Sequence, residues 1–86
     1  MNIGVEISLY PINADYIPPI QAFIERLNAH PRLRIITNDM STQVFGNFDD
    51  VMPAVTAEIR RSFEENALSI FAMKVLGPFS PGSLSD

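Results

Sequence analysis

The chain has 86 residues, 47% of them hydrophobic, with no cysteine and a net charge of −4 from six Lys or Arg and ten Asp or Glu. This composition predicts one globular domain and excludes a disordered chain, a disulfide scaffold, a thiolate metal site and a cysteine nucleophile. An acidic surface repels phosphate backbones, so we expect no nucleic-acid partner. We find no signal-peptide pattern and no run of about 20 apolar residues, so we expect a cytoplasmic protein with no membrane partner.

Residues 2–10 alternate between apolar and polar side chains, which is typical of a strand with one buried face. A helix is expected next, because Pro18 and Pro19 suit a first helical turn and apolar residues then recur at helical spacing. The helix must end before Pro31, which cannot continue it. Residues 33–37 and 42–45 predict two further strands.

A second helix is expected to begin with Asp50 as its cap, because Pro53 then occupies a position whose amide needs no helical partner. Its expected buried stripe is Val51, Val55, Ile59 and Phe63. Residues 68–76 predict a last, nearly all-apolar strand. We therefore expect one domain over residues 1–77, followed by a flexible tail, residues 78–86, that is rich in Gly, Pro and Ser.

The β-α-β-β-α-β order predicts an α+β sandwich of the ferredoxin-like type. We expect a four-stranded antiparallel sheet of order 4-1-3-2, with both helices on one face. Right-handed crossovers place the first and third strands side by side at the centre, and we expect these two strands to run parallel. The uncovered face is half apolar and half polar, which favours association with a second copy of the chain.

The polar turn between the second and third strands, "NDMS", leads into "TQ", and this cluster of amides and hydroxyls has two interpretations. In one, Asn38 and Asp39 form the turn, and Ser41, Thr42 and Gln43 face water. In the other, these side chains hydrogen-bond a flat heterocycle, because an amide offers one acceptor and two donors that match an aminopyrimidine. Glu6 is likewise either a surface residue or a carboxylate that faces a ligand, a dimer interface or Lys74.

The sequence offers little for catalysis or metal binding. His30 is the sole histidine, and a single histidine without cysteine is a poor basis for a metal site. The sequence contains neither a nucleophile elbow nor a glycine-rich phosphate loop. We expect no catalytic residue, no metal and no resident cofactor. The alternative is a small dimeric enzyme that uses Glu6 and His30 as acid and base.

Three stretches, "SLYPINADYIPPIQAFIERLN", "TNDMSTQVFGNFDDVMPAVTAEIRRSFE" and "FAMKVLG", together resemble the YkoF-like family of thiamine- and hydroxymethylpyrimidine-binding proteins. The resemblance covers the chain from Glu6 to Gly77, and "TNDMSTQVFG" is its most specific part. It implies a ferredoxin-like domain that assembles through its sheet as a homodimer or a dimer of dimers. It also implies binding of thiamine or its hydroxymethylpyrimidine precursor, without catalysis, in salvage or transport.

The resemblance places the family's motif on residues 38 and 40–43. Glu6 would suit the thiazolium cation of thiamine, and Tyr10, Phe45 or Phe48 would stack on a ring. The predicted ligand-binding set is therefore Glu6, Ser8, Tyr10, Asn38, Met40, Ser41, Thr42, Gln43 and Phe45. A structural or regulatory module without a small ligand is the second alternative, in which the polar turn seals a subunit contact.

Overall fold

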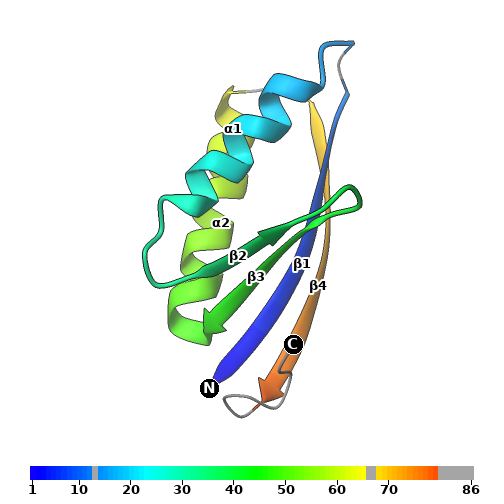
Figure 1. The fold of residues 1–86 in the computed structure, drawn as a ribbon. Helices are drawn as coiled ribbons and strands as arrows, with labels where there is room; N and C mark the ends of the chain where they lie inside the picture. The colour runs from blue at the N-terminus through cyan, green and yellow to red at the C-terminus, as the bar shows by residue number, and fades with distance from the viewer. Residues whose placement is uncertain (13, 66–67, 80–86) are drawn as a thin grey trace.

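The computed structural model describes residues 1–12, 14–65 and 68–79. Along the chain lie β1 (Asn2–Pro11), α1 (Ile17–Asn28), β2 (Arg34–Thr37), β3 (Thr42–Asn47), α2 (Phe48–Glu65) and β4 (Ser69–Phe79). The strands form one sheet of order β2-β3-β1-β4, which is the predicted order read from the opposite edge. Both helices lie on one side of this sheet (Figure 1), so the predicted ferredoxin-like fold is confirmed.

The two central strands, β1 and β3, run antiparallel, from Asn2 opposite Asn47 to Ile7 opposite Thr42. The expectation that they run parallel is wrong. Each helix connects two strands that are separated by one other strand in the sheet, and the β2–β3 hairpin reverses the chain direction. The strand that fills the gap between β2 and β1 is therefore antiparallel to both.

The core lies between the sheet and the helices, as the alternation of β1 predicts. Val5 and Ile7 are each 1% exposed, and both point toward the helices. They pack in one cluster with residues from both helices and from β3, namely Phe23, Leu27, Val44, Val51 and Val55. Burial of this apolar surface is the main source of stability in a domain of this size.

The start of α2 differs from the prediction. The side-chain oxygen of Asn47 accepts a hydrogen bond of 3.0 Å from the Asp49 amide, so Asn47 rather than Asp50 caps the helix. Pro53 consequently lies inside the helix. Its missing N–H removes only the one bond to the carbonyl four residues earlier, and α2 continues to Glu65.

The buried stripe of α2 also differs by one position at its C-terminal end. Val51 and Val55 are fully buried and Ile59 packs partly against the core, as predicted, but Phe63 is 51% exposed. Ser62 is buried in its place, and its hydroxyl accepts a 2.7 Å hydrogen bond from Arg26. A polar residue fits this position because α1 supplies its partner.

β4 extends to Phe79, two residues beyond the predicted end of the domain at Gly77. The rest of the predicted tail, residues 80–86, lies outside the described residues. Among the helices that the structure describes, neither is long and apolar enough to cross a membrane.

Candidate functional site

The turn between β2 and β3 is organised by the Asn38 side chain. Its oxygen accepts hydrogen bonds from the amides of Met40, at 2.8 Å, and Ser41, at 3.1 Å. The backbone N–H of Asn38 in turn donates a hydrogen bond to the Ser41 carbonyl, at 3.0 Å. This asparagine-based turn replaces the glycine that a tight hairpin needs, and it leaves the NH₂ group of Asn38 outside these bonds.

Two side chains of β1 attach this turn to the sheet. Ser8 donates a 3.3 Å hydrogen bond to the Met40 carbonyl, and Ser41 donates one of 3.1 Å to the Glu6 carboxylate. Lys74 lies directly across from Glu6 on β4, with its ammonium 3.9 Å from the carboxylate. Glu6 and Ser8 therefore hold the turn against β1.

Beyond these bonds, β1 has an edge without a pairing strand. β3 pairs with β1 only as far as Ile7, whereas β4 pairs with it as far as Pro11. Among the described residues, the edge of β1 from Ser8 to Pro11 on the hairpin side therefore takes no part in a ladder. Its backbone N–H and C=O groups are hydrogen-bonding groups that need partners.

A cavity of about 390 Å³ lies between this edge, the turn and α1; we call it the hairpin hollow. Ile20 and Ile24 of α1, with Ile7 and Leu9 of β1, give it apolar walls. Its polar groups come from the hairpin and include Thr37 and Thr42, whose hydroxyls lie 3.2 Å apart. Apolar walls with a few convergent polar groups are typical of small-molecule sites.

The structure does not bring the nine predicted binding residues into one cavity, and the register places the side chains of Ser8 and Tyr10 on the same side of β1 as Glu6. Six of them line the hairpin hollow, namely Ser8, Tyr10, Asn38, Met40, Ser41 and Thr42. The other three, Glu6, Gln43 and Phe45, line a second hollow of about 530 Å³ on the sheet face that the helices leave uncovered. A third hollow of about 420 Å³ on that face includes Glu6, Ser8 and Ser41.

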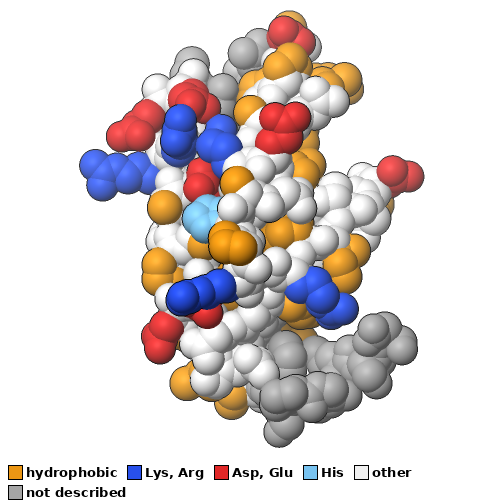
Figure 2. All heavy atoms as spheres, turned by 60° about the vertical axis from the view of Figure 1, so that its left-hand side comes forward, with side chains coloured by type: hydrophobic (Ala, Val, Ile, Leu, Met, Phe, Trp, Pro, Cys, Tyr) orange, Lys and Arg blue, Asp and Glu red, His pale blue; other side chains and the backbone are white. Residues whose placement is uncertain are grey.

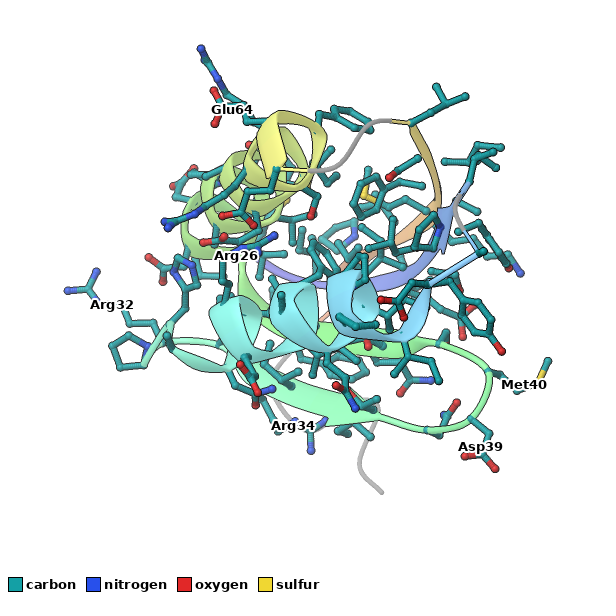
Figure 3. The ribbon with its side chains drawn as sticks, turned by 90° about the horizontal axis from the view of Figure 1, so that it is seen from above. Arg26, Arg32, Arg34, Asp39, Met40 and Glu64 are labelled. Atoms are coloured by element: carbon teal, nitrogen blue, oxygen red, sulfur yellow. The ribbon has the colours of Figure 1, made fainter. Side chains whose placement is uncertain are left out.

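Two of the predicted residues, Phe45 and Met40, have distinct surroundings. The Arg34 guanidinium lies 4.7 Å from the centre of the Phe45 ring, and Gly4 lies against the edge of that ring. Phe45 is thus already packed. The Met40 side chain is 84% exposed at the outer end of the hairpin, where Figure 3 shows it beside Asp39 and directed away from the domain.

Sequence reasoning missed the contribution of α1, whose residues Ile20 and Ile24, with the N-cap residue Tyr16, form one wall of the hollow. Helical spacing predicts that these residues face the sheet but not which part of it they face. One signal was available, because the first strand is predicted to be much longer than the third, and a length difference leaves part of one strand unpaired.

Figure 2 shows charged side chains gathered over the two helices, and several of them form ion pairs between α1 and α2. Arg26 of α1 lies 2.9 Å from Glu58 and 3.0 Å from Glu65 of α2, and His30 lies 2.9 Å from Glu58. We call these residues, together with Ser62, the interhelical cluster. Burial raises the pKa of Glu58, but hydrogen bonds from His30 and Arg26 and the charges of both outweigh it and hold that pKa below its ordinary value.

The enzyme alternative requires Glu6 and His30 to act at one site, but the structure places them on opposite sides of the sheet. His30 contacts Glu58 on the helical side, whereas Glu6 lies on the uncovered face of the sheet. The sheet therefore stands between the two groups. Within the described residues, no three His, Asp or Glu side chains lie close enough to hold a metal ion.

Fold and hollow together define a ferredoxin-like domain with a cavity at the end of its hairpin. A family model described as the YKOF-related family matches residues 2–83, and the chain belongs to this family. No curated protein matches the chain in sequence.

Several solved structures share the fold. A candidate thiamine biosynthesis/salvage protein of Thermotoga maritima superposes with a TM-score of 0.81 at 17% identity, over 99% of this chain and 90% of that chain. A hypothetical protein of Methanocaldococcus jannaschii superposes with a TM-score of 0.78 at 19% identity, over 91% of this chain and 81% of that chain. A protein of Streptococcus pneumoniae superposes with a TM-score of 0.74 at 15% identity, over 96% of this chain and 93% of that chain.

Proposed function

We propose that this protein binds thiamine or its hydroxymethylpyrimidine precursor, without catalysis, in salvage or transport. The observation that carries the proposal is the hairpin hollow, a cavity of about 390 Å³ with apolar walls and polar groups from the hairpin, which six of the predicted binding residues border. Membership of the YKOF-related family and the likeness to the Thermotoga maritima protein support a thiamine-related role.

The chemistry of the hollow suits a flat nitrogen heterocycle. An aminopyrimidine presents alternating donors and acceptors along one edge, and the unpaired edge of β1 presents backbone groups of both kinds. The Asn38 NH₂ group and the Thr42 hydroxyl add side-chain partners from the hairpin. Apolar walls from α1 would cover the faces of the ring.

The three predicted residues outside the hollow take other roles in this proposal. Glu6 positions the turn through its hydrogen bond with Ser41 and contacts no ligand in the hollow. Gln43 and Phe45 belong to the uncovered sheet face, where a second copy of the chain would lie.

Removing the Thr42 hydroxyl tests the site. Thr42→Val keeps the shape of a side chain that is 5% exposed, and we expect it to weaken thiamine binding by about tenfold, as the loss of one buried hydrogen bond does. Isothermal titration calorimetry of thiamine and hydroxymethylpyrimidine against both proteins measures this, with chromatography to verify that the ligand is recovered unchanged. Thr56→Val is the matched control, because the Thr56 hydroxyl bonds only its own helix.

Three results would contradict the proposal. Absence of heat with either ligand at high micromolar concentration would remove the binding function. An equal loss of thiamine affinity in Thr42→Val and Thr56→Val would show that the ligand does not bind in the hairpin hollow. Conversion of the ligand would favour the enzyme alternative.

The non-catalytic part of the proposal is supported by the placement of His30. Its ring is engaged with Glu58 on the helical side, and the part of the chain that the structure describes places no histidine or lysine in the lining of the hairpin hollow. The hollow thus lacks the side chains that most often transfer protons near neutral pH.

We also propose that a second copy covers the uncovered sheet face. Three apolar residues on it, Ile36, Ile70 and Leu76, are 40%, 54% and 59% exposed. Register places all of them on the same side of the sheet as Glu6. An exposed apolar surface of this kind marks an association site.

A charge on this face should disrupt the association. We expect Leu76→Glu to shift the protein toward the monomer in analytical ultracentrifugation by at least about tenfold in dissociation constant, because a carboxylate would be buried without a partner. Val75→Glu is the matched control, since Val75 is 49% exposed but lies on the opposite side of β4. A wild-type monomer, or the same shift in both variants, would contradict an interface on this face.

A further inference from the structure

We infer that the hairpin hollow accepts only ligands without a phosphate group. This inference rests on the proposed function and names the ligand class more narrowly. It follows from three features of the hollow: the positions of the cationic side chains, the chemistry of the α1 N-terminus and the charge at the rim.

The first feature is that the hollow has no Lys or Arg among the described residues that line it. The chain has six Lys and Arg, and the described residues include all of them. Arg26 belongs to the interhelical cluster, and Arg60 and Arg61 pair with glutamates on the outer surface of α2. Phosphate sites in proteins commonly use Arg guanidinium forks or Lys ammonium groups, so the hollow lacks the side chains that bind phosphate most strongly.

The three remaining cations also lie elsewhere. Arg32 pairs with Asp50 at 3.5 Å, and Figure 3 shows it at the opposite end of the domain from Asp39. Arg34 lies over the Phe45 ring on the uncovered face. Lys74 is also on that face, beside Glu6, whose carboxylate opposes its charge.

The second feature concerns α1, whose N-terminal turn borders the hollow through Tyr16 and Ile20. A helix N-terminus ordinarily binds anions through the free amides of its first turn. Here Pro18 and Pro19 occupy that turn, so two of these amides do not exist. The N-cap residue, Tyr16, makes no side-chain cap hydrogen bond either.

The third feature is the charge at the rim, where Asp39 is the ionisable acid of the hairpin turn. Figure 3 shows Asp39 at the outer end of the hairpin, so its carboxylate adds negative charge at the rim of the hollow. We expect repulsion between the Asp39 carboxylate and a phosphate bound in the hollow to weaken binding by up to about tenfold per added charge at low salt. A cationic or neutral ligand meets no such penalty.

The chemistry of the ligand then places the protein in a reaction sequence. Thiamine and hydroxymethylpyrimidine each carry a primary alcohol, and phosphorylation of this alcohol gives the ester that the hollow would reject. The protein would therefore hold its ligand after uptake or after hydrolytic release from an ester. The reaction that removes the ligand from it would be phosphoryl transfer to that alcohol.

Competition calorimetry with thiamine, thiamine monophosphate and thiamine diphosphate tests the inference. In low-salt buffer we expect monophosphate to bind about tenfold more weakly than thiamine, and diphosphate more weakly again, with the differences shrinking as salt is added. Asp39→Lys should narrow the ratio of thiamine to monophosphate affinity. Glu64→Lys makes the same change in net charge on α2, far from Asp39 in Figure 3, and should leave that ratio unchanged.

The outcomes separate the two proposals. Monophosphate binding as tight as thiamine binding would overturn phosphate exclusion while leaving the proposed function in place. If Asp39→Lys and the wild type had the same ratio of thiamine affinity to monophosphate affinity, the Asp39 charge would have no part in phosphate exclusion. Failure of every ligand to bind would overturn the proposed function itself, and phosphate exclusion with it.

Discussion

Replacing Glu58 with alanine is expected to lower the free energy of unfolding by about 2 kcal/mol, because a largely buried guanidinium loses one of its two carboxylate partners and keeps Glu65 and Ser62. The Glu58 and Arg26 side chains are only 13% and 16% exposed, and their charged atoms lie 2.9 Å apart. His30 contacts the same carboxylate and would also lose its partner. Urea denaturation at pH 7 measures the change.

The matched control is Glu64→Ala, which removes another α2 glutamate from an ion pair. Glu64 is 64% exposed and lies 3.5 Å from Arg60 one turn away, so its loss should cost less than about 0.5 kcal/mol. Equal costs for the two variants would show that the interhelical cluster contributes no more than a surface pair.

The same comparison has a defined dependence on pH. The folded state holds the pKa of Glu58 below its ordinary value of 4.5. A depressed pKa contributes stability that is present above the unfolded pKa and is lost as the pH falls through the folded pKa. The advantage of the wild type over Glu58→Ala should therefore be complete above pH 4.5 and decline below it. A difference that grew on acidification would contradict this assignment.

The interhelical cluster also matters for the hollow, although it lies elsewhere on α1. Arg26 bonds α1 to α2 near the C-terminal end of α1, and Ile20 and Ile24, which precede it on the same helix, line the wall of the hollow. The position of that wall thus depends on how firmly the two helices are held together. Loss of Glu58 would then loosen ligand binding without removing any ligand contact.

Much of the fold could be predicted because local patterns decide it. The alternation in β1 predicts which face is buried, and Pro18, Pro19 and Pro31 mark the limits of α1. The start of α2 could not be predicted in the same way. Pro53 indicates a later start, because a proline inside a helix removes one hydrogen bond and its ring crowds the carbonyl four residues earlier; the Asn47 cap offsets part of that cost.

The site was harder to predict because it depends on how strands end rather than on how they pair. The predicted cluster from Asn38 to Gln43 is polar for two reasons that the sequence cannot separate. Asn38 uses its side-chain oxygen to close the turn, while neighbouring residues on β3 alternate between the two faces, so Thr42 points to the helices and Gln43 away from them. Period-two alternation predicts this division, but only the observed register shows which side faces the hollow.

Filling the hairpin hollow is expected to abolish thiamine binding. Ile20 is partly buried on α1 and lines the hollow, so Ile20→Trp would place an indole ring in the space where a ligand ring would lie. We expect affinity to fall by at least about a hundredfold, because the new side chain and the ligand cannot occupy the same volume. Calorimetry with thiamine measures the loss, and urea denaturation verifies that the variant is folded.

Gln21→Trp is the matched control, since Gln21 is the next residue of α1 and is exposed to solvent. The two variants add the same side chain to the same helical turn, and only one of them enters the hollow. Retained binding in Ile20→Trp would mean that the ligand lies outside the hollow, and the uncovered sheet face, with Glu6, Gln43 and Phe45, would then be the place to look for it. Loss in Ile20→Trp alone, with both proteins stably folded, places the ligand between α1 and the hairpin turn.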